Sequence, residues 1–324
     1  MMGIASFFTK RKYKNSRITY YLQAIIREII PDLLCRMQLG RKLKSIQKYD
    51  ANYIQSRVNY YNKLKNFTDN LDMLRPLCEF KIPKKIRVYY FDGYQYTRYF
   101  SKKLKAAFLP GDITHVPDFP TILKSRPIGS NNANSVLLNL DKVRHFMFVN
   151  DKKPFQSKKD MLVFRGAVTQ PHRRRFLELY SNHPLCNVGQ VNRDKDNGRF
   201  LKEKMTIDEQ LEYKFILSLE GNDVATNLKW VMSSNSVAVM PRPKFETWFM
   251  EGTLIPNVHY ILINDDYSDM EDRLNHYIQH PAEALEIVKN ANEYVNQFRN
   301  KKREDLISLL VLDKYFSETG QYNS

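Results

Sequence analysis

Residues 213–240, YKFILSLEGNDVATNLKWVMSSNSVAVM, constrain the fold of this chain more than any other stretch. An apolar run at 215–219 ends at the polar turn Glu220-Gly221-Asn222-Asp223, and a helix-like segment at 224–233 leads to a second apolar run at 236–240. This order predicts a strand, a tight turn, a helix and a second strand, which together form one α/β crossover. In such a unit a ligand lies at the carboxyl end of the strand. There, free N–H groups and the dipole of the next helix favour an anion.

Similar patterns alternate through residues 85–300. Strands are expected over 85–91, 135–140, 146–149, 161–164, 186–191 and 258–263, and helices over 94–105, 171–180, 269–280 and 282–300. Thr206 and Glu209 form a capping box, Asp141 and Ser268 are further candidate caps, and Pro281 opens the last of these helices. The alternation predicts an α/β fold with mainly parallel sheets.

The length of 324 residues and a hydrophobic content of 43% suit two compact domains, each with its own core. We expect four parts. These are a basic helical region at 1–75, an α/β domain at 76–150, a second α/β domain at 151–300, and a C-terminal helix and tail at 301–324.

The net charge of +16 is unevenly distributed along the chain. Residues 1–70 hold 14 Lys and Arg against 4 Asp and Glu, so most of the excess lies in the first fifth. A basic block implies an anionic partner, which is nucleic acid, acidic lipid or a phosphorylated substrate. Composition alone does not choose among these.

Two helices are expected before residue 64. Ile18, Leu22, Ile25 and Ile29 recur at the spacing of a helix stripe, and a second helix begins near Pro31-Asp32. The basic cluster Arg41, Lys42, Lys44 and Lys48 follows. One interpretation is a helical cap with a solvated basic face, and the other is an amphipathic surface that docks on anionic lipid.

The cysteines Cys35, Cys78 and Cys186 are odd in number and form no CxxC pair, which suggests a reducing compartment and no structural zinc. No apolar segment approaches the roughly 20 residues that cross a bilayer. The apolar part of the amino terminus is too short for a secretory signal. These features predict a cytosolic location.

Polar residues follow two strands of the second half at matching points, Arg165-Gly166 and the turn at 220–223. If both strands lie in one sheet, these residues face the same crevice. Arg165 then offers a phosphate a guanidinium group that can form two parallel hydrogen bonds. Gly166 and Gly221 allow a ligand to approach the backbone closely, and Asn222 or Asp223 caps the helix. Lys229 either reaches the same place or is solvated. The alternative is a capped crossover helix that binds no ligand.

Metal ligation has little support in the sequence. Asp194-Lys195-Asp196 is formally a DxD, but it lies among Asn, Arg and Gly and is interpreted as a solvated loop. The histidines form no HxH or HExxH pattern. The absence of GxSxG and of a Walker loop argues against a hydrolase elbow and a nucleotide kinase.

The segment at 213–240 and four further runs carry a family resemblance: KSRPI at 124–128, NSVLLNLDKVRHF at 134–146, FRGAV at 164–168 and PLCNVG at 184–189. Over roughly residues 80–300 the chain resembles glycosyltransferase family 90, most closely its bacterial branch of lipopolysaccharide-core enzymes. The resemblance implies a GT-B architecture, with two Rossmann-like domains facing a cleft. The domain at 151–300 would bind a UDP-sugar donor and that at 76–150 the acceptor. It also implies an inverting, metal-independent transfer.

The resemblance extends to single residues. Inversion requires a general base. Asp118, in the Asp-Phe-Pro run, occupies a place like that of the base in animal members. The alternative is that Asp118 only helps to form a turn. Asn227 stands where animal members hold an arginine, so the phosphate contact passes to Lys229 or Arg165. Glu246 resembles an acidic residue that binds donor hydroxyls, and is otherwise simply exposed. Lys124 and Arg126 are candidates for acceptor binding.

The sequence therefore predicts a transferase that moves a hexose, glucose or galactose, from a UDP-sugar to the lipopolysaccharide inner core, with no cofactor besides the donor. It would act in the cytoplasm, peripherally on the anionic inner face of the inner membrane. The rivals are a basic nucleic-acid-binding protein and a membrane-surface scaffold with a degenerate donor site. The first is disfavoured because the charge lies away from the polar strand ends, so no nucleic-acid partner is expected.

Overall fold

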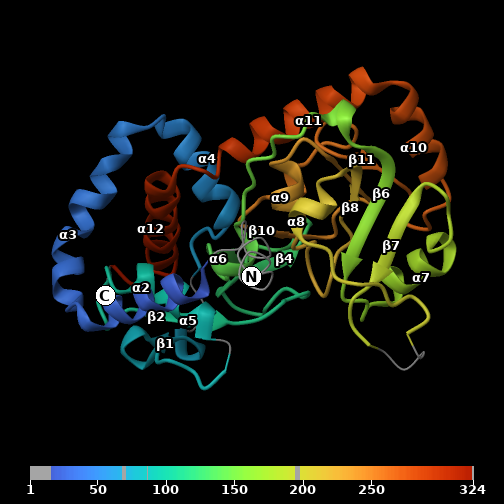
Figure 1. Cartoon of the computed structure of the whole chain (residues 1–324). Helices are drawn as coiled ribbons and strands as arrows, with labels where there is room; N and C mark the ends of the chain where they lie inside the picture. The colour runs from blue at the N-terminus through green and yellow to red at the C-terminus, as the bar shows by residue number, and fades with distance from the viewer. Residues whose placement is uncertain (1–15, 68–70, 86, 194–197, 323–324) are drawn as a thin grey trace, which may run out of the picture. The chain divides into compact units, whose positions relative to one another are not determined.

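The chain folds into two compact units (Figure 1). It has the mixed α/β structure with parallel sheets that the sequence predicted. A computed structural model describes residues 16–67, 71–85, 87–193 and 198–322. Within these residues, unit 1 comprises His145–Pro243 and Thr253–Gln297, and unit 2 comprises Ser16–Arg144, Lys244–Gly252 and the chain from Phe298 onward. The sequence analysis placed residues 244–252 with the second α/β domain and residues 301–324 apart. The structure groups both with unit 2.

Unit 1 is built on a parallel five-stranded sheet of order β11-β9-β8-β6-β7. Its strands are β6 (Lys159–Gly166), β7 (Cys186–Gln190), β8 (Tyr213–Leu217), β9 (Val237–Met240) and β11 (Ile261–Leu262). Every residue of β8 and β9 is buried. Strands in a parallel sheet with both faces covered read as continuous apolar runs, which explains why the sequence predicted both.

The helices of unit 1 are α7 (Pro171–Tyr180), α8 (Ile207–Gln210), α9 (Leu228–Met232), α10 (Met270–Gln279) and α11 (Pro281–Asn296). Helix α7 has the predicted bounds, and the capping box of Thr206 and Glu209 is present at α8. Two predictions were wrong in detail. Asp269, not Ser268, precedes α10 as its N-cap. Helix α9 has five residues, because residues 224–227 form turns and bends instead of its first helical turn.

Unit 2 contains a four-stranded sheet of order β1-β2-β3-β5 and a separate antiparallel pair, β4 with β10. The strands are β1 (Arg75–Pro76), β2 (Lys105–Leu109), β3 (Thr121–Leu123), β4 (Ser125–Pro127), β5 (Ser135–Leu137) and β10 (Phe245–Thr247). Strands β2, β3 and β5 are parallel, so their carboxyl ends share one edge. That edge is where ligands bind in open α/β sheets.

The helices of unit 2 are α2 (Arg17–Ile29), α3 (Asp32–Lys44), α4 (Ala51–Tyr61), α5 (Arg87–Thr97), α6 (Lys142–His145) and α12 (Lys301–Glu318). The short 3-10 turns η1 (Ser45–Lys48), η2 (Leu71–Met73) and η3 (Leu77–Glu79) also lie in unit 2, η4 (Phe155–Ser157) lies in unit 1, and η5 (Glu251–Thr253) spans the boundary after Gly252. Helix α12 is central to unit 2, since Ile307, Leu312 and Tyr315 are fully buried. It is joined to α4 by an ion pair in which Arg57 Nη2 lies 2.8 Å from Oε2 of Glu304.

Two strand predictions were wrong. Of the strand expected at 85–91, the described residues from Arg87 onward are helical. Helix α5 starts at Arg87, and its buried residues include Tyr89 to Gly93, Tyr96 and Thr97. A short aromatic run fits a buried helix as well as a strand. Residues 146–149 are irregular, because the Val149 N–H donates to Oγ of Ser233 and not to a strand partner. The helix predicted at 94–105 ends at Thr97, and β2 begins at Lys105.

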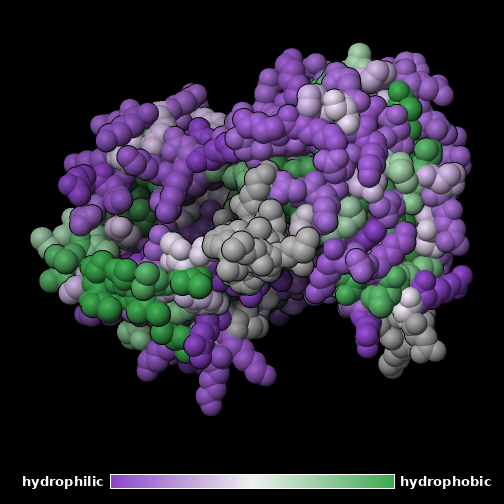
Figure 2. Space-filling view, viewed as in Figure 1, coloured by the Kyte–Doolittle hydropathy of each residue, from purple (hydrophilic) through white to green (hydrophobic). Residues whose placement is uncertain are grey.

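Helices α2 and α3 carry an unusual number of exposed apolar side chains, which Figure 2 shows as a hydrophobic area over α2. In the described part of the chain, no helix has the length and hydropathy needed to cross a membrane.

Candidate functional site

Two loops meet at the carboxyl edge of the unit 1 sheet, and Arg173 of α7 joins them. Its guanidinium donates to the carbonyl oxygens of Ala167 after β6 (2.8 Å) and of Leu219 and Glu220 after β8 (2.7 and 2.8 Å). His172 also donates through Nε2 to the Glu220 oxygen, at 2.8 Å. Burial lowers the pKa of Arg173, but an arginine remains charged far above neutral pH. Arg173 therefore fixes the spacing of the two strand ends.

Further hydrogen bonds order the same edge. Gln170 Nε2 donates to Oδ1 of Asn222 at 2.5 Å, and the Val168 N–H donates to Oδ1 of Asn192 at 2.7 Å. The predicted residues at 165–166 and 221–223 thus lie at one sheet edge, as the sequence analysis expected for two strands of one sheet. Asn222 is exposed there, whereas Asp223 is buried.

Arg165 does not project a spare guanidinium toward this edge. Its Nη1 donates to the oxygens of Phe164 and Asn187, its Nη2 to Oδ1 of Asn187, and its Nε to the oxygen of Glu203. Burial lowers the pKa of Arg165. Packing within the chain explains why residue 166 is a glycine, because a Cβ there would lie 2.7 Å from the Phe164 ring. Arg165 and Gly166 shape the end of β6 in this structure.

The start of α9 also differs from the expectation. Asn227 is the N-cap, but its side chain donates to the Leu217 oxygen at 2.9 Å and caps no helical N–H. Lys229 is fully buried, with Nζ 5.9 Å from the centre of the Phe146 ring. In a five-residue helix few peptide dipoles add up, so its dipole is weak. The anion corner predicted from α9 is therefore smaller than the sequence suggested.

A charged cluster lies at the carboxyl edge of the unit 2 sheet. Asp112, after β2, pairs with Nζ of Lys124 at 2.5 Å and with Nη2 of Arg144 at 3.2 Å. Arg144 Nε also pairs with Asp141 at 2.8 Å. Burial raises the pKa of Asp141 to about 6. Perturbed carboxyl groups are common at functional sites, and the sequence analysis assigned Asp141 only a capping role.

Asp118 lies in the loop between β2 and β3, three residues before β3 begins, and it is exposed. Because β2, β3 and β5 are parallel, this position is at the amino edge of the sheet, opposite the charged cluster. Its backbone oxygen accepts a hydrogen bond from Nδ2 of Asn134 at 2.9 Å. The loop is therefore anchored through its main chain while the Asp118 carboxylate is open to a ligand.

Arg126 and Glu246 lie in the interior of unit 2, where Nε of Arg126 donates to Oε1 of Glu246 at 2.7 Å. Arg126 donates further to the oxygens of Tyr60, Tyr61 and Ser135, and the Tyr60 hydroxyl donates to Glu246. Both residues are buried, as is Lys124. The predicted contacts of Arg126 and Lys124 with the acceptor and of Glu246 with the donor therefore do not fit their positions. Glu246 is also in unit 2 and not in the unit assigned to the donor.

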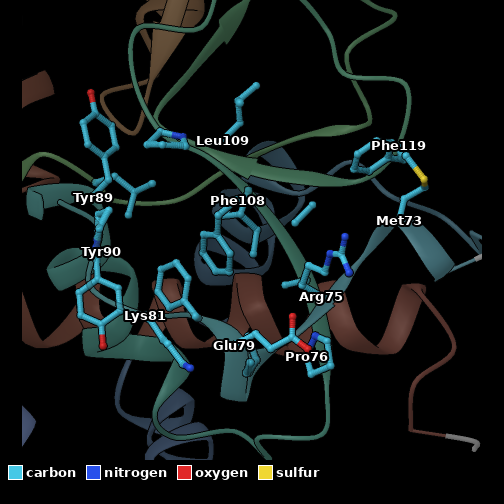
Figure 3. Close-up of a pocket in the computed structure, with 18 residues that line it drawn as sticks. Met73, Arg75, Pro76, Glu79, Lys81, Tyr89, Tyr90, Phe108, Leu109 and Phe119 are labelled. Atoms are coloured by element: carbon cyan, nitrogen blue, oxygen red, sulfur yellow. The ribbon is translucent and has the colours of Figure 1, made fainter. Parts of the chain in front are cut away.

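A cavity of about 460 Å³ lies on another side of unit 2, beside β1, β2 and α5 (Figure 3). Aromatic and aliphatic side chains dominate its lining, including those of Tyr89, Tyr90, Phe108 and Leu109. None of the predicted site residues lines it. Because a sugar nucleotide presents phosphates and hydroxyl groups, this apolar surface does not suit it.

Among the described residues, one group has the spacing of a metal site: His276, His280 and Glu283 on α10 and α11. It is exposed, His276 Nε2 lies 2.8 Å from Oε2 of Glu283, and it belongs to neither sheet edge. The DxD at 194–196 lies outside the described residues.

The sequence pattern of Glycosyl transferase family 90 matches residues 135–315, more than half of the chain, and the chain belongs to this family. The fold described above is thus that of a glycosyltransferase, as the resemblance in the sequence indicated. A particular relative is the O-glucosyltransferase LpsA of Dichelobacter nodosus. It is 40% identical over 304 residues, and the alignment covers 93% of this chain and 95% of that protein.

Arg173 was missed as a site residue, although the sequence contained a signal for it. It stands in the basic run His172–Arg175, directly after the strand that ends at FRG. A cation in the first turn of a helix is unfavourable for the dipole, so its presence there indicates a specific partner. The structure shows that this partner is a set of carbonyl oxygens.

Proposed function

We propose that the protein transfers glucose from UDP-glucose to a sugar hydroxyl of the lipopolysaccharide inner core. The observation that carries the proposal is the 40% identity, over nearly the whole of both chains, to an O-glucosyltransferase. It favours glucose over galactose as the transferred hexose. In this proposal the carboxyl edge of the unit 1 sheet binds the donor, and the exposed loop of Asp118 in unit 2 meets the acceptor, in a GT-B arrangement of the two units.

In this proposal the donor diphosphate lies at the carboxyl edge of the unit 1 sheet, against the loops that Arg173 holds. Backbone N–H groups of those loops and Asn222 contact the donor, and Gly221 allows close approach. The acceptor oxygen attacks C1 of glucose, and the bond from C1 to the diphosphate oxygen breaks. The configuration inverts, and UDP leaves with the bonding electron pair. Fixed dipoles can stabilise the departing diphosphate without a metal ion.

Asp118 is the proposed general base, which takes the proton of the acceptor hydroxyl as the new bond forms. Its carboxylate is exposed, whereas Asp112 in the same loop is already paired with Lys124 and Arg144. Exposure is what a base needs in order to reach a hydroxyl group of a large acceptor.

The acceptor of this reaction is anchored in a membrane, so we place the protein on the cytoplasmic face of the inner membrane as a peripheral protein. Lys124 and Arg126 are buried and therefore no longer candidates for the phosphorylated acceptor. Exposed cations of the N-terminal region, such as Arg41 and Lys44, provide that attraction instead.

The test is transfer by the purified full chain, with truncated lipopolysaccharide as acceptor and a panel of UDP-hexoses and other nucleotide sugars. Turnover with UDP-glucose, retained in EDTA, and an inverted anomeric configuration by NMR are expected. Turnover with another donor alone would reject UDP-glucose, and loss of turnover in EDTA that Mg²⁺ restores would reject the metal-independent route. No turnover and no thermal shift with UDP would favour the scaffold. Steeply salt-dependent binding of duplex DNA without UDP binding would favour the nucleic-acid rival.

A further inference from the structure

Ten of the 17 large apolar side chains that are exposed in the described part of the chain lie between residues 18 and 37. We call them the apolar ridge: Ile18, Tyr21, Leu22, Ile25, Ile26, Ile29, Ile30, Leu33, Leu34 and Met37. Ile18, Ile29 and Met37 are 77%, 75% and 74% exposed. Figure 2 shows the hydrophobic area that they form over α2. A contiguous exposed patch of this kind marks an interaction surface.

The apolar face of α2 points away from unit 2. At about 100° per residue, Ile18, Leu22, Ile25 and Ile29 fall on one side of the helix. The opposite side carries Tyr20 and Ala24, which pack on Tyr90 and Phe91 of α5. The helix thus already has its protein contact, and the remaining apolar face is left for a partner.

The ridge is held rigidly at the bend between α2 and α3. Arg98, directly after α5, donates to the oxygens of Arg27 and Ile30 at 2.7 and 2.6 Å, and it pairs with Asp32 at 3.4 Å. The Tyr20 hydroxyl donates to Asp92 at 3.0 Å. Binding to the ridge therefore costs little ordering of the backbone.

The charges beside the ridge identify the partner. Arg17, Arg41, Lys42, Lys44 and Lys48 are exposed around it. The two acidic residues of α2 and α3 are turned inward. Asp32 is buried against Arg98 and Lys102, and Glu28 is bonded to Tyr90. The exposed charged residues of α2 and α3 are thus all cations. An apolar face bordered by such cations is complementary to an anionic lipid surface. In a symmetric dimer through the ridge, these cations would meet one another.

We propose that α2 and the first half of α3 lie in the plane of an anionic membrane, with the apolar ridge inserted among the acyl chains. The cations then contact the lipid phosphates at the level of the headgroups. This mode of binding is that of an in-plane amphipathic helix. The proposal rests on the membrane location given under the proposed function and adds the surface that binds the membrane. Its test uses no sugar transfer, so membrane binding and glucose transfer can fail separately.

The test is flotation of the full chain with vesicles of phosphatidylethanolamine and phosphatidylglycerol, compared with vesicles of phosphatidylcholine alone. Binding to the anionic vesicles, weakened at least tenfold by high salt, is expected. In the variant Ile25→Trp, the emission of the new side chain should shift to the blue on binding and should be quenched by lipids brominated on the acyl chains. An unshifted Trp would overturn insertion.

Variants separate the ridge from the rest of the surface. The triple substitution Leu22→Ser/Ile25→Ser/Ile29→Ser should reduce vesicle binding at least tenfold. The matched control Leu179→Ser/Ile255→Ser, at sites 51% and 53% exposed in unit 1, should leave it unchanged. Since the ridge side chains are already exposed, the triple variant should keep the melting temperature of the parent.

Two results would overturn the proposal in favour of another occupant. If the parent is a dimer by light scattering and the triple variant a monomer, with equal vesicle binding, the ridge binds a second copy. If deletion of residues 1–15 abolishes vesicle binding while the triple variant retains it, the first residues are the anchor. Equal binding of the parent and the triple variant to the anionic vesicles rejects the apolar ridge as the surface that binds the membrane.

Discussion

Arg126 and Glu246 form an ion pair inside unit 2, 2.7 Å apart, that joins β4 to β10 across 120 residues of sequence. Arg126 also donates to main-chain oxygens of α4 and β5. The pair therefore holds together three segments of unit 2 that are distant in the chain.

We expect Arg126→Met to destabilise unit 2 by about 3–5 kcal/mol, because it leaves the Glu246 carboxylate buried without its cation. The double variant Arg126→Met/Glu246→Leu should lose less than the sum of the single losses. The chain contains two tryptophans, Trp230 in unit 1 and Trp248 in unit 2. Urea unfolding followed by Trp248 fluorescence, in a Trp230→Phe background, isolates the relevant transition.

The control for this cycle is Arg87→Met, at an exposed site in unit 2. Its effect should stay within about 0.5 kcal/mol. Equal effects of Arg87→Met and Arg126→Met would contradict an energetic role for the buried pair.

Arg173→Met should lower kcat/KM for the sugar nucleotide by about 10- to 100-fold, mainly through KM, because the loops after β6 and β8 lose their common anchor. Arg174→Met is the matched control, since Arg174 is the next residue of α7 and pairs with Glu178 at 3.1 Å. Steady-state kinetics and the thermal shift with UDP measure the difference. If both variants behave alike, the carbonyl contacts of Arg173 do not organise the donor site.

Asp118→Asn should reduce kcat by about 10²–10⁴-fold, the range for loss of a general base. Binding of UDP should be unchanged, because the loop is held by its main-chain contact with Asn134. Single-turnover rates with saturating donor and acceptor provide the measurement. A variant with wild-type turnover would show that Asp118 is a turn residue, the alternative that the sequence left open.

Asp141 should make unit 2 less stable as the pH rises. Burial raises its pKa to about 6 in the folded chain, whereas an unfolded Asp titrates near 3.9. The folded state therefore binds the proton more tightly. Its stabilisation is complete below pH 4 and lost as the pH approaches 6, a change of about 3 kcal/mol.

The matched variant is Asp141→Asn, which keeps the positive φ of 55° that asparagine accepts readily. The difference in unfolding free energy between parent and variant, followed by Trp248 at pH 4 to 7, should vary with pH in the stated direction. A constant difference would mean that Asp141 does not titrate in this range.

The unit 1 sheet could be predicted because its strands carry their signal locally. In β8 and β9 a continuous apolar run is also a fully buried strand, and Pro171 marks the start of α7. Helix α5 could not be predicted in this way. Its run of Tyr89, Tyr90 and Phe91 suits a strand, and the contact with α2 that buries it is distant in sequence.

The site was predictable in place but not in detail. The strand ends at 165–166 and 220–223 lie at one sheet edge because parallel topology dictates it. Whether a cation faces a ligand or a carbonyl depends on partners that no local pattern shows. Arg165 bonds to Asn187 and Glu203, whereas Arg173 bonds to the loops themselves. Buried partners likewise decided the positions of Arg126 and Glu246.

Unit 2 is assembled from three stretches of the chain, and this has a consequence for the order of events during synthesis. Tyr315 of α12 donates to the oxygen of Pro120, and Glu304 of α12 accepts from Arg57 of α4, so α12 completes a core begun by α4. The sheet of unit 1 has all its strands by residue 262. A ribosome-bound chain can therefore finish the unit 1 sheet early, while unit 2 waits for α12 to emerge from the exit tunnel. Transfer activity should accordingly appear only after α12 has left the tunnel.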